Sequence, residues 1–124
     1  MSTPRNERGA MREMTGQEFG YQAILKSDES GTITSLIAYQ VLLDNPFQAV
    51  IWSVPRKSWI YAPGLAVPML YDDKYQDRRK QIDRMTAEQI ARETLRTELP
   101  SEQALQAMVE EGDRMGWTYG PPRH

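Results

Sequence analysis

The sequence predicts a single α+β domain, in which an antiparallel meander of three or four strands is followed by two or three C-terminal helices packed on one face. Three observations predict this class. The first half alternates apolar and polar residues over short runs, as half-buried strands do. Short polar turns separate these runs, which favours antiparallel hairpins over long parallel crossovers. The second half carries two helix-start signals ahead of apolar residues spaced by three and four.

The strands are expected at Phe19–Ser27, Thr32–Leu43, Phe47–Val54 and Ser58–Tyr61. Asp28-Glu29-Ser30-Gly31 and Asp44-Asn45-Pro46 supply the turn residues between the first three, and Gly31 tolerates a positive φ. The run Ala49-Val50-Ile51-Trp52 is almost continuously apolar, which predicts that the third strand is buried on both faces. Pro55-Arg56-Lys57 then forms a short connection to the fourth strand.

The segment after the strands is ambiguous. Leu65–Tyr71 is compatible with a short helix or a further strand, although Pro68 disfavours a regular central strand. Charged residues crowd from Asp72 to Arg84, which predicts an exposed loop or helix. Mutual ion pairing on a solvated surface explains this segment, with a Mg²⁺ site as the alternative.

Two helices are expected near the end. Thr86 and Gln89 have the spacing of a capping box, so a helix is predicted over about Ala87–Arg96. Ser101 is the expected N-cap of a second helix, which runs to about Glu111 with Gly112 as the residue after its end. Both are read as amphipathic helices that cover one face of the sheet.

The domain boundaries follow from composition. Residues 1–17 show no sustained hydrophobic period and are interpreted as a flexible N-terminal arm. Residues 18–116 form the single α+β domain, and residues 117–124 form an extended C-terminal tail containing Pro121-Pro122.

Composition excludes several kinds of chemistry. With no Cys, the chain has no thiolate nucleophile and no Cys-ligated metal. The single His124 is the last residue, where nothing would orient an imidazole for catalysis. The scattered glycines match neither phosphate-binding loop motif. We therefore predict no catalytic residue, no metal site and no cofactor.

No apolar run approaches the roughly 18 residues of a membrane span, so no membrane partner is expected. The N-terminal residues lack the apolar segment of a secretory signal, which favours a cytoplasmic protein. The chain is expected to fold alone or as a homo-oligomer.

The stretch Trp52–Tyr61 combines aromatic and cationic side chains. Trp59 and Tyr61 belong to the residue types that anchor protein interfaces, and Arg56 and Lys57 lie at the predicted hairpin tip. Aromatic residues interleaved with cations also contact nucleic acids. Packing within the sheet explains the same residues without a partner, so all three interpretations stay open. The net charge of −2 disfavours nucleic acid.

A second candidate surface is acidic. No basic residue occurs between Glu98 and Asp113, a segment that also contains Glu102, Glu110 and Glu111. Most such faces are only solvated. A functional acidic face would steer a basic partner, raising its association rate more than its final affinity.

Residues 19–113 resemble, in size, lack of Cys, element order and acidic helix, the small α+β immunity proteins that neutralise polymorphic toxins in bacteria. The segments PRKSWIYAP, RMTAEQIARE and ELPSEQAL are also similar to uncharacterised proteins of high-GC Gram-positive bacteria. The resemblance implies a toxin-neutralising role and carries no residue-level function.

The leading hypothesis is a non-enzymatic module that binds another protein, one with a basic surface. Steering is assigned to Glu102, Glu110, Glu111 and Asp113, and anchoring to Trp59 or Tyr61. The competing hypothesis is a small-ligand-binding protein or enzyme with a pocket between sheet and helices. That pocket would be lined by Trp52, Tyr61, Tyr71 and Asp72. A third hypothesis is nucleic-acid binding through Arg56, Lys57 and the basic positions of the 74–84 segment.

Overall fold

A computed structural model describes residues 19–26, 30–40 and 47–122 of the chain. The elements are β2 (Gly20–Leu25), β3 (Ile33–Gln40), β4 (Gln48–Ser53), β5 (Ser58–Tyr61), α2 (Pro63–Tyr71), the 3₁₀ helix η1 (Asp73–Arg78), β6 (Arg79–Ile82), α3 (Arg84–Glu93) and α4 (Glu102–Met115). The α+β class is confirmed, and helices follow the meander in the chain. The predicted arm at 1–17 and most of the first two predicted turns lie outside the described residues.

The sheet has five strands in the order β5-β4-β3-β2-β6, and every neighbouring pair is antiparallel. Strands β2 to β5 form the predicted four-stranded meander. The fifth strand, β6, was not predicted, because its sequence lies inside the charged segment Asp72–Arg84 that we read as exposed loop or helix. This prediction is wrong for β6, which pairs with β2 through the register Tyr21↔Ile82. An edge strand that carries charges leaves little hydrophobic pattern to detect.

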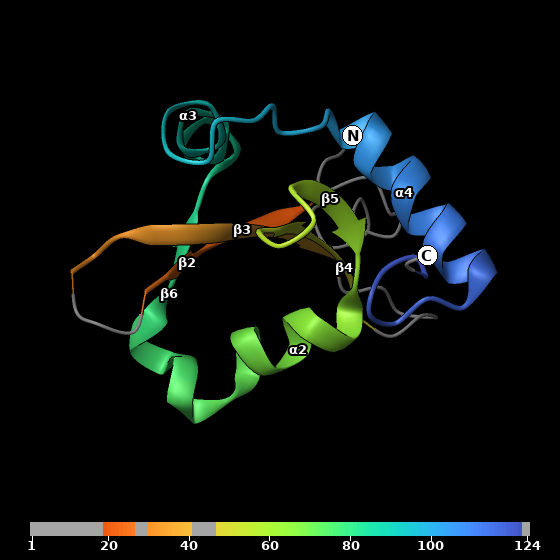
Figure 1. The fold of residues 1–124 in the computed structure, drawn as a ribbon, viewed down its shortest axis with the longest axis horizontal. Coiled ribbons are helices and arrows are strands. Elements are labelled where there is room, and N and C mark those ends of the chain that lie inside the picture. The colour runs from red at the N-terminus through yellow and green to blue at the C-terminus, as the bar shows by residue number, and fades with distance from the viewer. Residues whose placement is uncertain (1–18, 27–29, 41–46, 123–124) are drawn as a thin grey trace, which may run out of the picture.

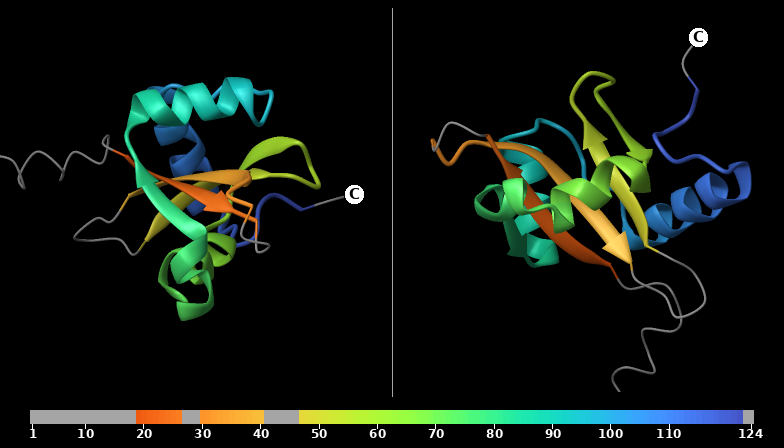
Figure 2. Two further views of the ribbon diagram at one scale, coloured as in Figure 1. Left: turned by 90° about the vertical axis from the view of Figure 1, so that its left-hand side faces the viewer. Right: turned by 90° about the horizontal axis from the view of Figure 1, so that it is seen from below.

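The helices cover both faces of the sheet. Figures 1 and 2 show α3 and α4 on one side of the strands and α2 on the other. The prediction that two helices share one face is confirmed for α3 and α4. The prediction of a third helix on that face is wrong, because α2 packs on the opposite face. The central strands explain this arrangement, since their side chains are apolar on both faces.

Each face has its own core. On the α3 and α4 side the buried residues include Tyr21, Ala23, Leu36, Ala38, Val50, Ala87, Ala91, Leu105 and Val109. On the α2 side they include Ile24, Ile37, Ala49, Ile51, Ala66 and Leu70. Successive residues of β4 therefore alternate between the two cores, as predicted for a strand buried on both faces.

The helix boundaries differ from those predicted. The N-cap of α3 is Asp83, whose Oδ1 accepts a hydrogen bond of 2.8 Å from the Thr86 amide, so this helix begins before the predicted capping box. Ser101 caps α4 as predicted, by accepting a 3.0 Å bond from the Ala104 amide. This helix continues past Gly112 to Met115, and Gly116 takes the left-handed conformation that ends it, with φ of 74°.

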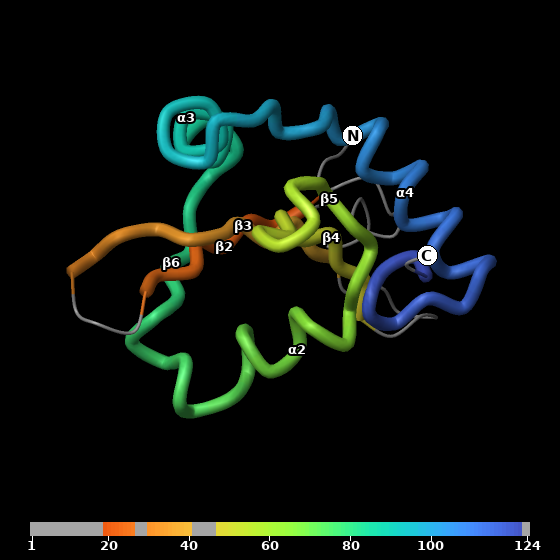
Figure 3. Tube along the Cα trace, in the orientation of Figure 1, coloured from red at the N-terminus to blue at the C-terminus, as the bar shows by residue number. Residues whose placement is uncertain are grey.

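Strand β6 also carries the chain from one face to the other. In Figure 3 the tube leaves α2 and η1 below the sheet and rises through β6 to α3 above it. The described part of the predicted tail, residues 117–122, is attached to the domain by the packing of Trp117 against the core on the α3 and α4 side and by several hydrogen bonds. The Gly64 amide donates to the Thr118 carbonyl at 2.8 Å, and Arg56 Nη1 donates to the Pro121 carbonyl at 2.7 Å.

Candidate functional site

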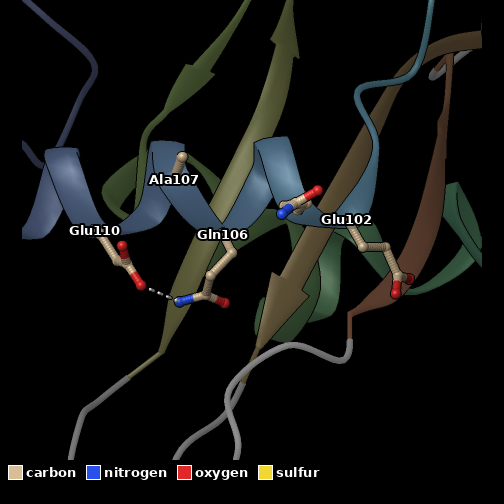
Figure 4. A pocket seen from close by; sticks show the side chains of 5 residues that line it. Glu102, Gln106, Ala107 and Glu110 are labelled. Atoms are coloured by element: carbon tan, nitrogen blue, oxygen red, sulfur yellow. Dashed lines mark hydrogen bonds between the residues drawn. The ribbon is translucent and has the colours of Figure 1, made fainter.

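The acidic residues of α4 lie along a hollow in the protein surface. Glu102, Gln106 and Glu110 are four residues apart and therefore share one side of the helix. Figure 4 shows these three side chains pointing the same way, and they line a hollow of about 560 Å³ together with Gln103 and Ala107. Gln106 was not among the predicted site residues, although its spacing from Glu102 and Glu110 places it in the same row. The row alternates carboxylate and carboxamide, so it offers mainly hydrogen-bond acceptors to a partner.

Hydrogen bonds order this row along its length. Gln106 accepts a 2.9 Å bond from Nε2 of Gln40 and donates a 3.2 Å bond to Glu110 Oε2. The Gln106 carboxamide thus links the end of β3 to the exposed carboxylate of Glu110. An ordered row loses less side-chain entropy when it binds than a freely rotating one.

Glu102 belongs to a partly buried polar network that ties α4 to α3. The Tyr21 hydroxyl donates to Glu102 Oε2 at 2.8 Å and accepts from Arg84 Nη1 at 2.9 Å. Arg84 in turn forms a 2.8 Å ion pair with Glu88. Burial raises the pKa of Tyr21 to about 12, an effect that Arg84 opposes and Glu102 reinforces. The hydroxyl therefore stays protonated and fixes the Glu102 carboxylate.

The remaining acids of α4 form no ion pair with a described residue. Glu110, Glu111 and Asp113 are exposed, and no Lys or Arg within the described ranges lies within ion-pair distance of them. Asp113 lines a separate hollow beside Tyr61, and it adds to the effect of burial in raising the pKa of that tyrosine. With four carboxylates and the single cation Arg114, α4 carries a net negative charge, which creates a local negative potential.

Of the two aromatic anchors predicted on the hairpin, Tyr61 is buried and Trp59 is half-buried. Tyr61 is 5% exposed, packs against Gly112 and donates a hydrogen bond to Gln48 Oε1, so it is a core residue and not an interface anchor. Trp59 is half-buried against the same core, with its indole N–H buried, and its ring lies 5.4 Å from that of Trp52. The predicted anchoring role fails for Tyr61, because helix α4 covers the strand that carries it.

The two cations of the hairpin, Arg56 and Lys57, lie in different environments. Arg56 donates to the C-terminal segment, as described above, and is half-buried. Lys57 is exposed at the turn and has a positive φ of 54°. Of these two residues, only Lys57 presents its charge freely to solvent.

The four residues of the predicted ligand pocket are not brought together. Trp52 lines a cavity on the α2 side of the sheet, whereas Tyr61 lines the hollow beside Asp113. Tyr71 is exposed and packs edge-on against Phe47 at 5.8 Å. Asp72 caps η1 by accepting a 3.1 Å bond from the Lys74 amide. A pocket between sheet and helix does exist, but its lining differs from the predicted set.

The basic positions of the 74–84 segment serve mainly internal contacts. Arg78 donates to the Leu25 carbonyl, Arg79 to the carbonyls of Met69 and Asp72, and Arg84 to Tyr21 and Glu88. Lys74 and Lys80 are exposed. Because these three guanidinium groups already donate to groups within the protein, fewer of the basic positions are left to contact phosphates, which weakens the nucleic-acid hypothesis.

Within residues 19–26, 30–40 and 47–122, no group of three His, Cys, Asp or Glu side chains is placed to hold a metal ion. None of the helices in those ranges has the length and apolar character needed to cross a bilayer. No family model matches this chain, and neither a curated protein nor a solved structure is similar to it.

Proposed function

We propose that this chain is a non-enzymatic protein-binding module whose helix α4 binds a basic segment of a partner protein. The observation that carries the proposal is the row Glu102, Gln106 and Glu110, which lines a hollow of about 560 Å³ on one side of α4. A hollow of this size accommodates side chains of a partner. Lys or Arg side chains match its acceptors in charge and in hydrogen bonding.

Three features support this proposal over a merely solvated helix. The row is ordered by bonds from Gln40 and Tyr21, so its acceptors are held in place before a partner arrives. The carboxylates of Glu110, Glu111 and Asp113 have no cationic partner in the described part of the chain. The helix itself is fixed to the sheet through Leu105, Val109 and Gly112, which are buried. A rigid surface with net negative charge suits electrostatic steering.

The immunity-type form of the proposal adds that the partner is a toxin whose basic surface the module occludes. Support comes from the small size of the domain, the meander followed by helices and the acidic character of α4. Here α4 would act by covering that surface, with no chemical step. Addition of the module at a 1:1 ratio should then abolish the activity of the captured toxin.

The test uses the full chain to capture partners from the native cell, followed by kinetics with the purified partner. The triple variant Glu110→Gln, Glu111→Gln, Asp113→Asn removes three exposed charges and leaves the Glu102 network intact. At low salt we expect its association rate constant to fall about tenfold, with a smaller change in dissociation. Added salt should reduce the difference.

A charge-matched control is available away from α4. Asp73→Asn, Asp77→Asn, Glu93→Gln removes the same charge from exposed positions on η1 and α3. An equal loss of association rate in this control would show that net charge alone is responsible, and the proposed α4 surface would be wrong. A captured partner without a basic contact surface would also contradict the proposal.

A further inference from the structure

A second candidate site lies on the opposite face of the sheet from α4. It is a cavity of about 230 Å³ between the strands and α2. Ile24 and Ile51 of the sheet form part of its wall, and Leu65 and Met69 of α2 form another part. These residues belong to or adjoin the core on the α2 side, so the cavity is lined mainly by apolar atoms.

The cavity opens to solvent between apolar side chains. Leu65 is 38% exposed and Val54 is 54% exposed, although both residues line the cavity. When a ligand covers apolar side chains that were in contact with water, the free energy of the complex is lowered, and this favours binding.

A fixed guanidinium lies at the cavity. Arg78 lines it, donates through Nε to the Leu25 carbonyl at 3.1 Å, and stacks on the Tyr75 ring with its guanidinium carbon 4.5 Å from the ring centroid. Two contacts therefore hold the side chain. No other described residue bonds to the Arg78 guanidinium, so its terminal nitrogens keep their donors.

Two hydroxyls that line the cavity are already used as donors within the sheet. The Ser35 hydroxyl donates to the Trp52 carbonyl at 2.7 Å, and the Thr34 hydroxyl donates to the Ile24 carbonyl at 3.3 Å. The two terminal nitrogens of a guanidinium match the two oxygens of a carboxylate in spacing and charge. The combination of an apolar wall and one held cation specifies a ligand with an apolar body and a carboxylate head.

We propose that this cavity binds a small apolar monocarboxylate, with its chain against Ile51, Leu65 and Met69 and its carboxylate on Arg78. The volume of about 230 Å³ equals that of roughly eight water molecules. A ligand of about eight to ten non-hydrogen atoms fits, such as a fatty acid of six to eight carbons. The site is independent of the α4 surface, because the two lie on opposite faces of the sheet (Figure 2).

The test titrates octanoate into the full chain, with calorimetry for affinity and backbone amide shifts for location. We expect saturable binding, with the largest shifts around Ile24, Ile51, Leu65 and Arg78. Arg78→Gln should raise the dissociation constant about tenfold or more, because a charge-assisted pair is lost. Octanol, which has the same chain without the charge, should bind more weakly and with equal affinity to wild type and Arg78→Gln.

Matched controls separate the site from general effects. Lys80→Gln removes an equal charge two residues away, on the opposite face, since Lys80 pairs with Ala23 of the other core. It should change the octanoate dissociation constant less than twofold. Leu65→Trp should block binding, whereas Val67→Trp, at an equally exposed position of α2 outside this cavity, should not.

The proposal is overturned if octanoate does not bind at millimolar concentration, or if Arg78→Gln and Lys80→Gln weaken binding equally. It is also overturned if the shifts map to the α4 side. Should Arg78→Gln fail to fold, the comparison of Leu65→Trp with Val67→Trp decides, because neither substitution touches the Arg78 contacts. Equal octanoate affinities for these two tryptophan variants would then exclude the cavity.

Discussion

Gly112 should be required for the packing of α4, and Gly112→Ala is expected to destabilise the protein. In a helix interior this substitution ordinarily stabilises by about 1 kcal/mol, because alanine loses less backbone entropy. Here an added Cβ would overlap Cγ and Cδ2 of the Tyr61 ring and would lie 2.7 Å from Tyr61 Cβ. Because Cβ is fixed to the backbone of β5, no rotation of the ring removes the whole overlap.

The overlap forces either Tyr61 or α4 to move. Overpacking of this kind costs about 1–3 kcal/mol. Loss of the hydrogen bond from Tyr61 to Gln48 adds about 1 kcal/mol. The higher helix propensity of alanine offsets about 1 kcal/mol of this cost. We therefore expect the free energy of unfolding to fall by roughly 1–3 kcal/mol.

Urea denaturation measures this loss as a lower midpoint at an unchanged slope. Gln103→Ala, at an exposed position of the same helix, is the control and should stay within about 0.5 kcal/mol of wild type. In a Tyr61→Leu background the same glycine substitution should cost much less, since the ring is gone. If Gly112→Ala equals or exceeds wild type in stability, the inferred contact between α4 and β5 is wrong.

Three further predictions test the elements around the site. Since the pKa of Tyr21 is raised to about 12, the native state binds more protons than the unfolded state above pH 10, so stability should fall as pH rises from about 10 to 12. Tyr21→Phe should flatten that fall in urea titrations between pH 8 and 11, and an unchanged slope would exclude Tyr21 as its source. Ser101→Ala should cost about 1 kcal/mol by removing the α4 N-cap, whereas Ser101→Asp should restore most of it; equal stability of all three proteins would contradict the cap. Lys57→Gly should raise the thermal midpoint, because its φ of 54° suits glycine, with a gain of up to about 1 kcal/mol; a lower midpoint would show that Lys57 makes a stabilising contact.

Local patterns were sufficient to predict the meander and the two amphipathic helices. Alternation in the strands and the cap at Ser101 are signals of a few adjacent residues, and they need no knowledge of distant contacts. The boundaries of α3 were missed by three residues, because Asp83 and Thr86 are both acceptable caps and only the folded backbone distinguishes them.

Features that depend on long-range contacts were not predictable. The sequence of α2 is apolar on all sides, so nothing in it specifies which face of the sheet it covers. Tyr61 was predicted as an interface anchor because tyrosine is common at interfaces. Its burial under α4 depends on Gly112, which lies fifty-one residues later in the sequence. Arg78 was part of a charged run with no local sign that it would stack on Tyr75 beside a cavity.

The pairing of β6 with β2 has a consequence for the order in which the fold forms. Each pair within the meander joins neighbouring strands, so it closes a short loop. The register Tyr21↔Ile82 instead requires closure of a loop of about sixty residues, whose entropy must be lost before the contact contributes. We therefore expect β6 to join the sheet after the folding transition state. Substitutions in β6 should then speed unfolding while leaving the refolding rate nearly unchanged.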